Sequence, residues 1–328
     1  MNRRRPWRRF TLLFAAVLLP TLVTAAVPVH ARGHEEAGGG APARGSARTG
    51  EDGAAELPPS EIRGTPGNTI PRETGRIAVT KVGEFTFEPA EVETVRPDLF
   101  EAGHFSIFDI LVHLDRRGDI DLRYHFDRDA DTHVIDSIDG RENWWYTAYY
   151  DGGWPERNVF RMDYFPYKDR MTIRIEPERP ERLASIREVH RREFARYLRA
   201  GSAVTVDTVS IQGPSSVVEF SNVEVRPHDL RSDMLEEGTV TAIDVLMSLA
   251  DEGKLSHRIE WVDTIGFASV QNYFVERIND DARRGRCGFV YEAGPDEYRG
   301  FRGNHIHLPS DARIIRAPEY VQYYWICV

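Results

Sequence analysis

The sequence predicts an α+β fold in which a similar unit occurs twice, and three observations lead to this prediction. Residues 106–126 (SIFDILVHLDRRGDIDLRYHF) recur without a gap at 241–261 (TAIDVLMSLADEGKLSHRIEW). Short runs of alternating apolar and polar residues surround each copy, as in sheets of few short strands. One long helical pattern at 178–201 lies between the copies. We therefore expect two tandem units, each with one helix on a small mixed sheet, joined by a long helix.

The repeated stretch has the features of a helix with defined ends. Ser106 and Thr241 are each followed three residues later by an aspartate, Asp109 or Asp244, in the pattern of a capping box. Glycines at the other end are typical of a left-handed C-terminal cap. The apolar residues between them have the three-and-four spacing of a buried stripe: Ile107, Ile110, Leu111 and Leu114 in the first copy. Both helices are expected to start at the same position of the repeat.

The N-terminal part predicts export. Residues 1–31 hold five arginines, then an apolar run and a small-x-small sequence, as in a cleaved export signal. An uncleaved membrane anchor is the alternative, although an apolar run interrupted by Pro20 is short for a span. Residues 32–75 are rich in Gly, Ala, Pro and charged residues, which predicts a disordered tether. The expected location is periplasmic or extracellular, tethered if the signal is uncleaved.

Charge and cysteine content restrict the partners and the compartment. The net charge of −10 becomes about −15 once residues 1–31, which hold five arginines and no acid, are removed. Such a surface repels nucleic acid, so no nucleic-acid partner is expected. Cys287 and Cys327 are the two cysteines of the sequence, and in an oxidising compartment they favour one disulfide. Two free buried thiols are the alternative, because spacing does not show the geometry a bridge needs.

The predicted units are 76–177 and 202–328, with the connecting helix at 178–201 between them. The first unit has predicted strands near 77–80, 85–87, 122–126, 134–138, 144–150, 159–162 and 171–175. In the second unit we match Arg226-Pro227 with Arg96-Pro97. We also match residues 274–279 with 134–139, and residues 287–294 with 145–152.

The turn SIDG at 137–140 and the strand WWYTAYYDGG at 144–153 carry a family resemblance. With the capped helix before them, they resemble the transcobalamin-like C-terminal domain, also known as domain of unknown function 4430. The resemblance covers residues 76–177 and, with more differences, 203–328, where Cys287 replaces the family's tryptophan. It implies two tandem β-grasp-like domains in an extracytoplasmic, non-catalytic module that helps to cover cobalamin in the vitamin carriers. It does not name a cofactor for this chain, whose cofactor is left unknown.

The aromatic strand is the predicted ligand-binding surface. Large rings offer a stacking area with a polar rim, and we single out Trp144, Trp145, Tyr146, Tyr149, Tyr150 and Trp154. Alternation along the strand divides most of them between two faces, and one face must pack on the helix. Plain aromatic packing is the alternative. An open pocket lined by these rings would favour binding, whereas packed or flat faces would favour assembly.

Two further groups of residues have the composition of metal sites. Asp127, Asp129 and Asp131 resemble the start of a calcium loop, with Asp136 as a further ligand. Thr132 and Ile138 stand where a standard loop needs glycine and glutamate, so only a looser site is predicted. His305 and His307, near Asp311, are the second group. The alternatives are a solvated acidic loop and a polar strand edge.

The sequence contains no nucleophile elbow, phosphate loop, zinc-protease helix or paired-cysteine motif, so we expect no enzyme activity. The predicted function is that of an exported, non-catalytic binding protein. Its aromatic face or the groove between the units would contact a small-molecule or cell-surface ligand. The alternative is a structural subunit of an extracytoplasmic protein complex without a small ligand.

Overall fold

The computed structural model describes residues 57–327, so the predicted export signal and the first part of the predicted tether lie outside the described residues. We call residues 75–177 the first half. Its strands are β2 (Gly75–Val79), β3 (Gly83–Phe87), β4 (Leu122–Asp127), β5 (Thr132–Ile138), β6 (Trp144–Tyr149) and β7 (Thr172–Pro177), and its α-helix is α1 (Ile107–Arg117). The sheet has the order β3-β2-β7-β6, with β2 and β7 parallel and the outer pairs antiparallel. The strands β4 and β5 form a separate hairpin.

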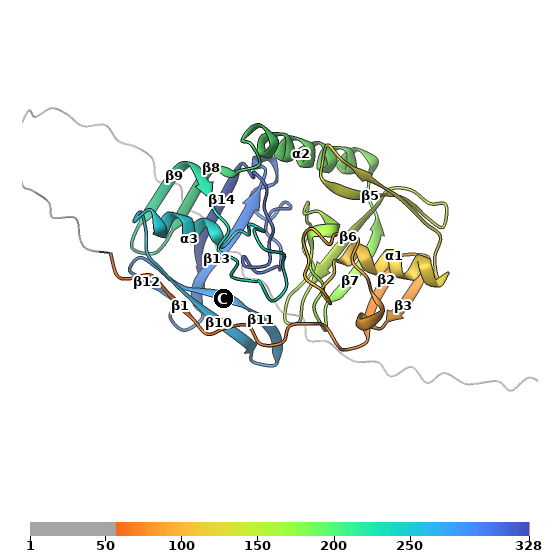
Figure 1. Ribbon diagram of the computed structural model, residues 1–328, viewed down its shortest axis with the longest axis horizontal. Helices are drawn as coiled ribbons and strands as arrows, with labels where there is room; N and C mark the ends of the chain where they lie inside the picture. The colour runs from red at the N-terminus through yellow and green to blue at the C-terminus, as the bar shows by residue number, and fades with distance from the viewer. Residues whose placement is uncertain (1–56, 328) are drawn as a thin grey trace, which may run out of the picture. The chain divides into compact units, whose positions relative to one another are not determined.

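The second half, residues 204–327, also has one four-stranded sheet and an α-helix (Figure 1), while its hairpin β10–β11 belongs to a second sheet of the order β1-β10-β11-β12. Its elements are β8 (Val204–Gln212), β9 (Val217–Val225), α3 (Asp244–Asp251), β10 (His257–Ile265), β11 (Ala268–Ile278), β12 (Asp281–Ala282), β13 (Cys287–Gly294) and β14 (Tyr320–Cys327). The sheet order is β9-β8-β14-β13, with β8 and β14 parallel. In both sheets the order is second, first, last and last-but-one strand of the half. The predicted α+β class is therefore confirmed.

The helix ends follow the predicted chemistry in part. At α1 the Ser106 side chain accepts from the Asp109 amide, and the Asp109 carboxylate accepts from the Ser106 amide, which is a complete capping box. Gly118 ends the helix at φ 78°, a left-handed conformation that glycine adopts without strain. In the second half Thr241 donates its amide and hydroxyl to Asp244, yet α3 starts only at Asp244. The predicted common start is wrong because residues 241–243 form a turn first.

The long connecting helix α2 spans Pro180–Arg199. Proline in its first turn has no amide hydrogen to leave unpaired, and Gly201 just beyond its end has φ 68°. Its buried residues are Leu183, Ile186, Val189 and His190. The structure therefore has a helix at the predicted place, whose N-terminal part is buried on one side while Leu198 near its end is exposed.

The predicted disordered tether is wrong for residues 57–75, which follow a defined path. Within this strap, β1 (Glu61–Arg63) pairs in parallel with β10, and the amides of Arg72 and Glu73 donate to Asp169 of the first half. The Arg277 guanidinium also donates to the Pro59 carbonyl. These backbone hydrogen bonds are not visible in a composition that is poor in large apolar residues.

The predicted strand at 159–162 is also wrong. The Val159 amide donates to Gly303 instead of to a neighbouring strand, and residues 162–164 form a short 3-10 helix. Alternating apolar residues here reflect burial in an irregular segment: Val159, Phe160 and Met162 are all buried.

The two halves meet through paired contacts. Phe100 and Leu235 form an isolated β-bridge. On one side of it the Glu101 amide donates to the Met234 carbonyl at 3.0 Å, and on the other the Glu236 amide donates to the Leu99 carbonyl at 3.1 Å. Each residue in one bond stands 135 positions from its equivalent in the other. Residues 57–327 belong to one compact unit.

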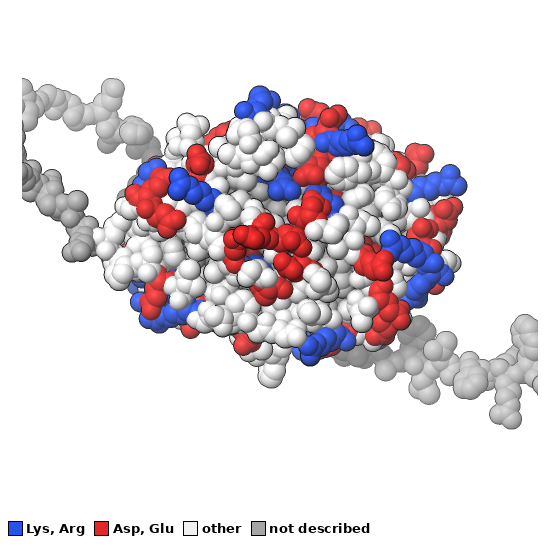
Figure 2. All heavy atoms as spheres, viewed as in Figure 1, with Lys and Arg blue, Asp and Glu red and all other residues white. Residues whose placement is uncertain are grey.

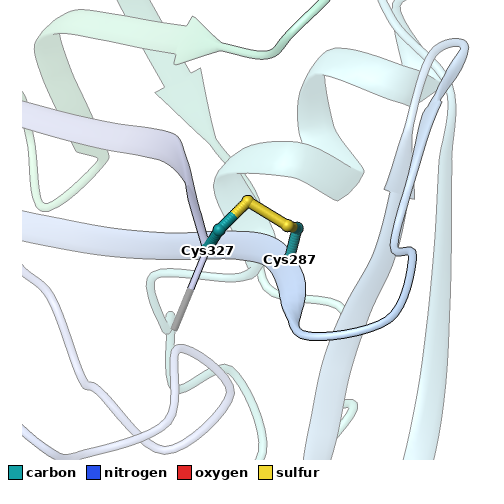
Figure 3. The surroundings of a disulfide bond; sticks show 2 residues. All are labelled: Cys287 and Cys327. Carbon is teal, nitrogen blue, oxygen red and sulfur yellow. A yellow bond between two sulfur atoms is a disulfide. The ribbon is translucent and has the colours of Figure 1, made fainter.

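Cys287 and Cys327, an opposed pair on β13 and β14, are joined by a disulfide (Figure 3). In the part of the chain that is described, no helix has both the length and the apolar character to cross a membrane. On the face drawn in Figure 2, basic and acidic side chains are interspersed, with acidic atoms gathered near the middle.

Candidate binding site

Each half contains the same buried ionic cluster next to its helix. The Arg96 guanidinium makes a two-pronged pair with Asp98 and donates a further hydrogen bond to the fully buried Asp163 at 3.2 Å. In the second half Arg231 pairs in the same way with Asp233 and donates to the fully buried Asp311 at 2.9 Å. The contacts therefore match Arg96 with Arg231, and the predicted match with Arg226 is wrong. Arg226 is solvent-exposed.

The buried aspartate of each cluster also accepts a hydrogen bond from the second strand of the hairpin, β5 in the first half and β11 in the second. Asp163 accepts from the His133 amide at 2.8 Å, and Asp311 accepts from the Tyr273 amide at 2.9 Å. Burial alone would raise both pKa values. In Asp163 the His133 ring and the Arg96 charge outweigh burial and lower the pKa, whereas in Asp311, which faces tyrosine in place of histidine, burial raises the pKa despite Arg231.

The hairpin strand and the sheet enclose a hollow in each half. We call the one in the first half the closed hollow: it has about 30 Å³ and is lined by Phe108, Thr132, His133, Val134, Ile135, Trp144, Trp145, Met162, Leu183, Arg187 and His190. We call the one in the second half the open hollow: it has about 200 Å³ and is lined by Tyr150, residues 272–275, residues 289–291, residues 305–310 and Tyr323. The two occupy equivalent places, because residues 132–135 of β5 correspond to residues 272–275 of β11.

The difference in volume has an evident cause. Three side chains of α2 fill the closed hollow: Leu183, Arg187 and His190. Among the residues that the structure describes, no helix takes that place beside the open hollow. The larger space is thus a consequence of a missing filling element and not of a different sheet.

The open hollow has an aromatic lining with few polar atoms. Most of its tyrosine hydroxyls are engaged in the fold: Tyr273 donates to Gly64, Tyr291 to Leu308 and Tyr323 to Ala242. Within residues 57–327 the hydroxyl of Tyr150 has no hydrogen-bond partner, and burial raises its pKa, so it stays protonated. The Asn272 side-chain oxygen is buried and also without a partner in this part of the chain.

Lys168 lies next to this lining. Its ammonium nitrogen is 5.2 Å from the centre of the Tyr150 ring and donates to the carbonyls of Val270 and Gln271. Burial, assisted by the charge of Arg231, lowers the pKa of Lys168 to about 7. The equivalent cation of the second half, Arg316, reaches in the opposite direction and contacts Asp131 and Tyr164. Each half thus places one basic side chain, Lys168 or Arg316, against residues of the other half.

The structure separates the six residues of the predicted aromatic site, and two of them, Trp144 and Tyr146, belong to the core. Trp144 and Tyr146 are buried and donate to the carbonyls of Arg141 and Phe160, and Trp145 donates to that of Asn158. Tyr149 is half-buried on the other face. Trp154 is solvent-exposed and stands edge-on to His307 at 4.0 Å between ring centres. Of the six predicted residues, Tyr150 alone lines the open hollow, which otherwise belongs to the second half.

Two other hollows have a different character. One of about 220 Å³ runs past Trp145, Tyr146 and Thr147, but charged residues border it: Arg157, Glu176, Glu178 and Arg182. Another of about 430 Å³ lies over β2, β3 and β7, between Arg76, Glu84 and Arg174. Binding sites for small molecules are predominantly apolar with few polar groups, which favours the open hollow.

The predicted metal sites lack the required geometry. Asp127 is paired with Arg191, and Asp131 with Arg96, Arg316 and Tyr164, so both carboxylates already have partners within the fold. His305 contacts Glu156 at 2.9 Å, while His307 contacts the Trp154 backbone and Asp311 lies in its own cluster. Within residues 57–327 no group of three potential ligands is placed to hold a metal ion.

Sequence reasoning missed Lys168 and the two ionic clusters, one around Arg96 and one around Arg231. The signal was present: Arg96-Pro-Asp98-Leu recurs as Arg231-Ser-Asp233-Met at the same 135-residue spacing as the helices. The proline pair at 97 and 227 drew the alignment five residues away. Counted from the start of β7 and β14, Trp145 likewise corresponds to Val290 and not to the predicted Cys287.

Comparisons with protein-family models, with curated proteins and with solved structures find no match for this chain.

Proposed function

We propose that the protein is an exported, non-catalytic binding protein that holds a small molecule in the open hollow. The observation that carries this proposal is an aromatic hollow of about 200 Å³, lined by Tyr150 of the first half and by residues of the second half, whose counterpart in the same chain has only about 30 Å³. A space of this size and lining is typical of a ligand site. The site draws on Tyr150 and on the groove between the halves, and not on the other rings of the aromatic strand.

We further propose that the chain arose by duplication of one β-grasp-like unit, as the resemblance to the transcobalamin-like domain implies. Three observations support it: equal strand order, equivalent arginine clusters, and reciprocal bonds around Phe100 and Leu235. Each observation concerns different atoms. A chance similarity of two unrelated sheets would not reproduce all of them.

Export is supported by the N-terminal sequence and by the disulfide between Cys287 and Cys327. Disulfides persist in oxidising compartments and are rare in the cytosol. We therefore propose a periplasmic or extracellular location.

The alternative function, an assembly subunit, has one observation in its favour. Phe267 at the tip of the β10–β11 hairpin is fully exposed, and the neighbouring Ile265 is half-exposed. Exposed large apolar side chains in one place are typical of protein contacts. A tip of two residues is a small surface, however, and the open hollow is the better-developed site.

The binding proposal is tested by methyl NMR on the folded chain with a panel of single-ring aromatics, sugars, haem and corrinoids. We expect saturable shifts for the methyl groups of Val275, Val290 and Leu308 with at least one class. Val290→Trp should abolish them, because the first half carries Trp145 at this position and its hollow is nearly full. The control is Val217→Trp, at an exposed strand end. Absence of such shifts with every class would exclude this site.

A further inference from the structure

We infer that the ligand of the open hollow is a small, uncharged aromatic molecule that carries one N–H or O–H donor, the class of phenol or indole. This inference rests on the proposed function. It follows from the volume of the hollow, from the pairing of the charges around it, and from the side chain that fills its counterpart.

The volume sets the size of the ligand. A cavity of about 150 Å³ lined by aliphatic and aromatic side chains holds one benzene molecule. At about 200 Å³ the open hollow holds one ring with a few additional atoms, or two small fused rings. Haem, corrinoids and oligosaccharides are far larger and could insert only an edge.

The charged side chains near the hollow have hydrogen-bond or ionic partners within the fold, and none of them belongs to its lining. Lys168 donates to two backbone carbonyls, Arg231 is paired with Asp233 and Asp311, and Glu156 with His305. The lining residues themselves include no Asp, Glu, Lys or Arg. Burial lowers the pKa of His307, so its ring is neutral at neutral pH. An ionic ligand would lose its hydration without gaining a counter-ion, which is costly.

The lining rings determine the shape. Tyr150, Phe274, Phe289 and Tyr291 offer faces and edges against which a flat ring packs favourably. The Tyr150 hydroxyl, which has no partner within residues 57–327, adds a polar contact at one side. An aliphatic ligand of equal volume would lack the ring contacts.

The closed hollow shows what this architecture accepts. There His190 of α2 supplies a flat ring, and its Nε2 lies 2.7 Å from the carbonyl oxygen of Val159, a residue that does not itself line this hollow. Burial and the charge of Arg161 lower the pKa of His190 to about 3, so the ring is neutral and its N–H is the donor. The fold therefore already encloses a neutral ring that donates one hydrogen bond to a backbone carbonyl.

The equivalent carbonyl in the second half belongs to His307. Residue 159 stands four positions before Asp163, and residue 307 four positions before Asp311. His307 lines the open hollow, and its carbonyl oxygen accepts no hydrogen bond from the described residues. An N–H or O–H group of the ligand donates a hydrogen bond to this His307 oxygen, as the His190 N–H does to the Val159 oxygen in the first half.

The experiment is isothermal titration calorimetry of the folded chain with matched probes: phenol against anisole, indole against 1-methylindole, and benzoate and benzylamine as charged rings. We expect phenol and indole to bind. Their methylated forms should bind about tenfold more weakly, since each leaves a carbonyl unpaired. The charged rings should show no saturation. Val290→Trp should abolish the heat signal, and Val217→Trp should retain it.

The outcomes separate the two levels of the argument. Equal binding of methylated probes, or tighter binding of benzoate or benzylamine, overturns the inference but leaves a binding site in place. Saturation that survives Val290→Trp also overturns it, because the ring would then lie elsewhere. If no probe binds, while haem, a sugar or a corrinoid shifts the methyl groups of the hollow, the ligand class is wrong. If nothing shifts them, the proposed function fails as well.

Discussion

At Lys168 a normally charged side chain is buried without an ionic partner of its own. Its nitrogen is fully buried, yet the acceptors it reaches are neutral carbonyls of Val270 and Gln271. A neutral amine has two N–H donors, which these two acceptors satisfy. The nearest carboxylates, Asp311 and Asp233, are held by Arg231, whose own charge further disfavours an ammonium group. The fold therefore favours the uncharged lysine.

This preference predicts a pH dependence of stability. The folded pKa is about 7 and the unfolded one 10.5, so between these values the unfolded chain binds one proton more than the folded chain. The free energy of unfolding should therefore rise with pH across this window, by up to about 1.4 kcal/mol per unit from this group. Below about pH 7 both states are protonated and the contribution is flat.

Urea unfolding at pH 7 and pH 9.5 measures this effect. Lys168→Met, which keeps the length of the side chain without a charge, should remove this part of the slope. Lys254→Met, at a solvent-exposed lysine, is the control and should leave it unchanged. An identical slope in all three proteins would contradict the assignment.

At the scale of single elements, α2 distinguishes the two hollows. Its sequence predicts an amphipathic helix, and the structure confirms Leu183, Ile186 and His190 as buried. What the pattern cannot state is where this face packs, because helical periodicity identifies a face but not its partner. The sequence likewise predicts strands at 122–126 and 134–138, but not that they pair as the hairpin β4–β5 or that side chains of α2 line the hollow beside it.

Shortening one side chain of α2 should convert the closed hollow into an open one. Leu183 lines it and is almost fully buried, so Leu183→Ala should cost about 2–5 kcal/mol of unfolding free energy. The variant should also gain a weak site for benzene, whose binding would raise the melting temperature. Leu198→Ala, on the exposed part of the same helix, is the control. A loss of stability without benzene binding would mean that the hollow collapses.

The disulfide and the strap show opposite degrees of predictability. Cysteine content and compartment favoured the Cys287–Cys327 bridge, and the register of β13 and β14 places the two residues opposite each other. The strap 57–74 was predicted to be disordered, because its order depends on backbone bonds to β10 and to Asp169, which lie far away in the sequence. Long-range backbone pairing leaves little trace in local composition.

For the molecule as a whole, the sequence repeat did not indicate how the two halves contact each other. The 21-residue match indicated a helix and a following strand in each half, while the contacts between Phe100 and Leu235 lie in a stretch without regular structure. Arg96 and Arg231 border this contact from equivalent sides. The exchange of Lys168 and Arg316 adds a second reciprocal pair. A contact of this kind has the symmetry of a twofold dimer within one chain.

Such interlocking predicts that the halves unfold together. Arg96→Met leaves the fully buried Asp163 with only its His133 and Thr132 partners, and Arg231→Met leaves Asp311 with the Tyr273 amide. Each change should lower the free energy of unfolding by about 3–5 kcal/mol, the typical effect of removing one partner of a buried ion pair.

The halves contact each other through Phe100 and Leu235 and through Lys168 and Arg316. Scanning calorimetry should therefore show one unfolding transition, which moves to lower temperature in either variant. The exposed ion pair between Arg116 and Glu93 offers a matched control. Arg116→Met removes only this surface contact and should leave the transition temperature unchanged. Two transitions, of which each variant lowers only one, would show that the halves are independent domains joined by α2.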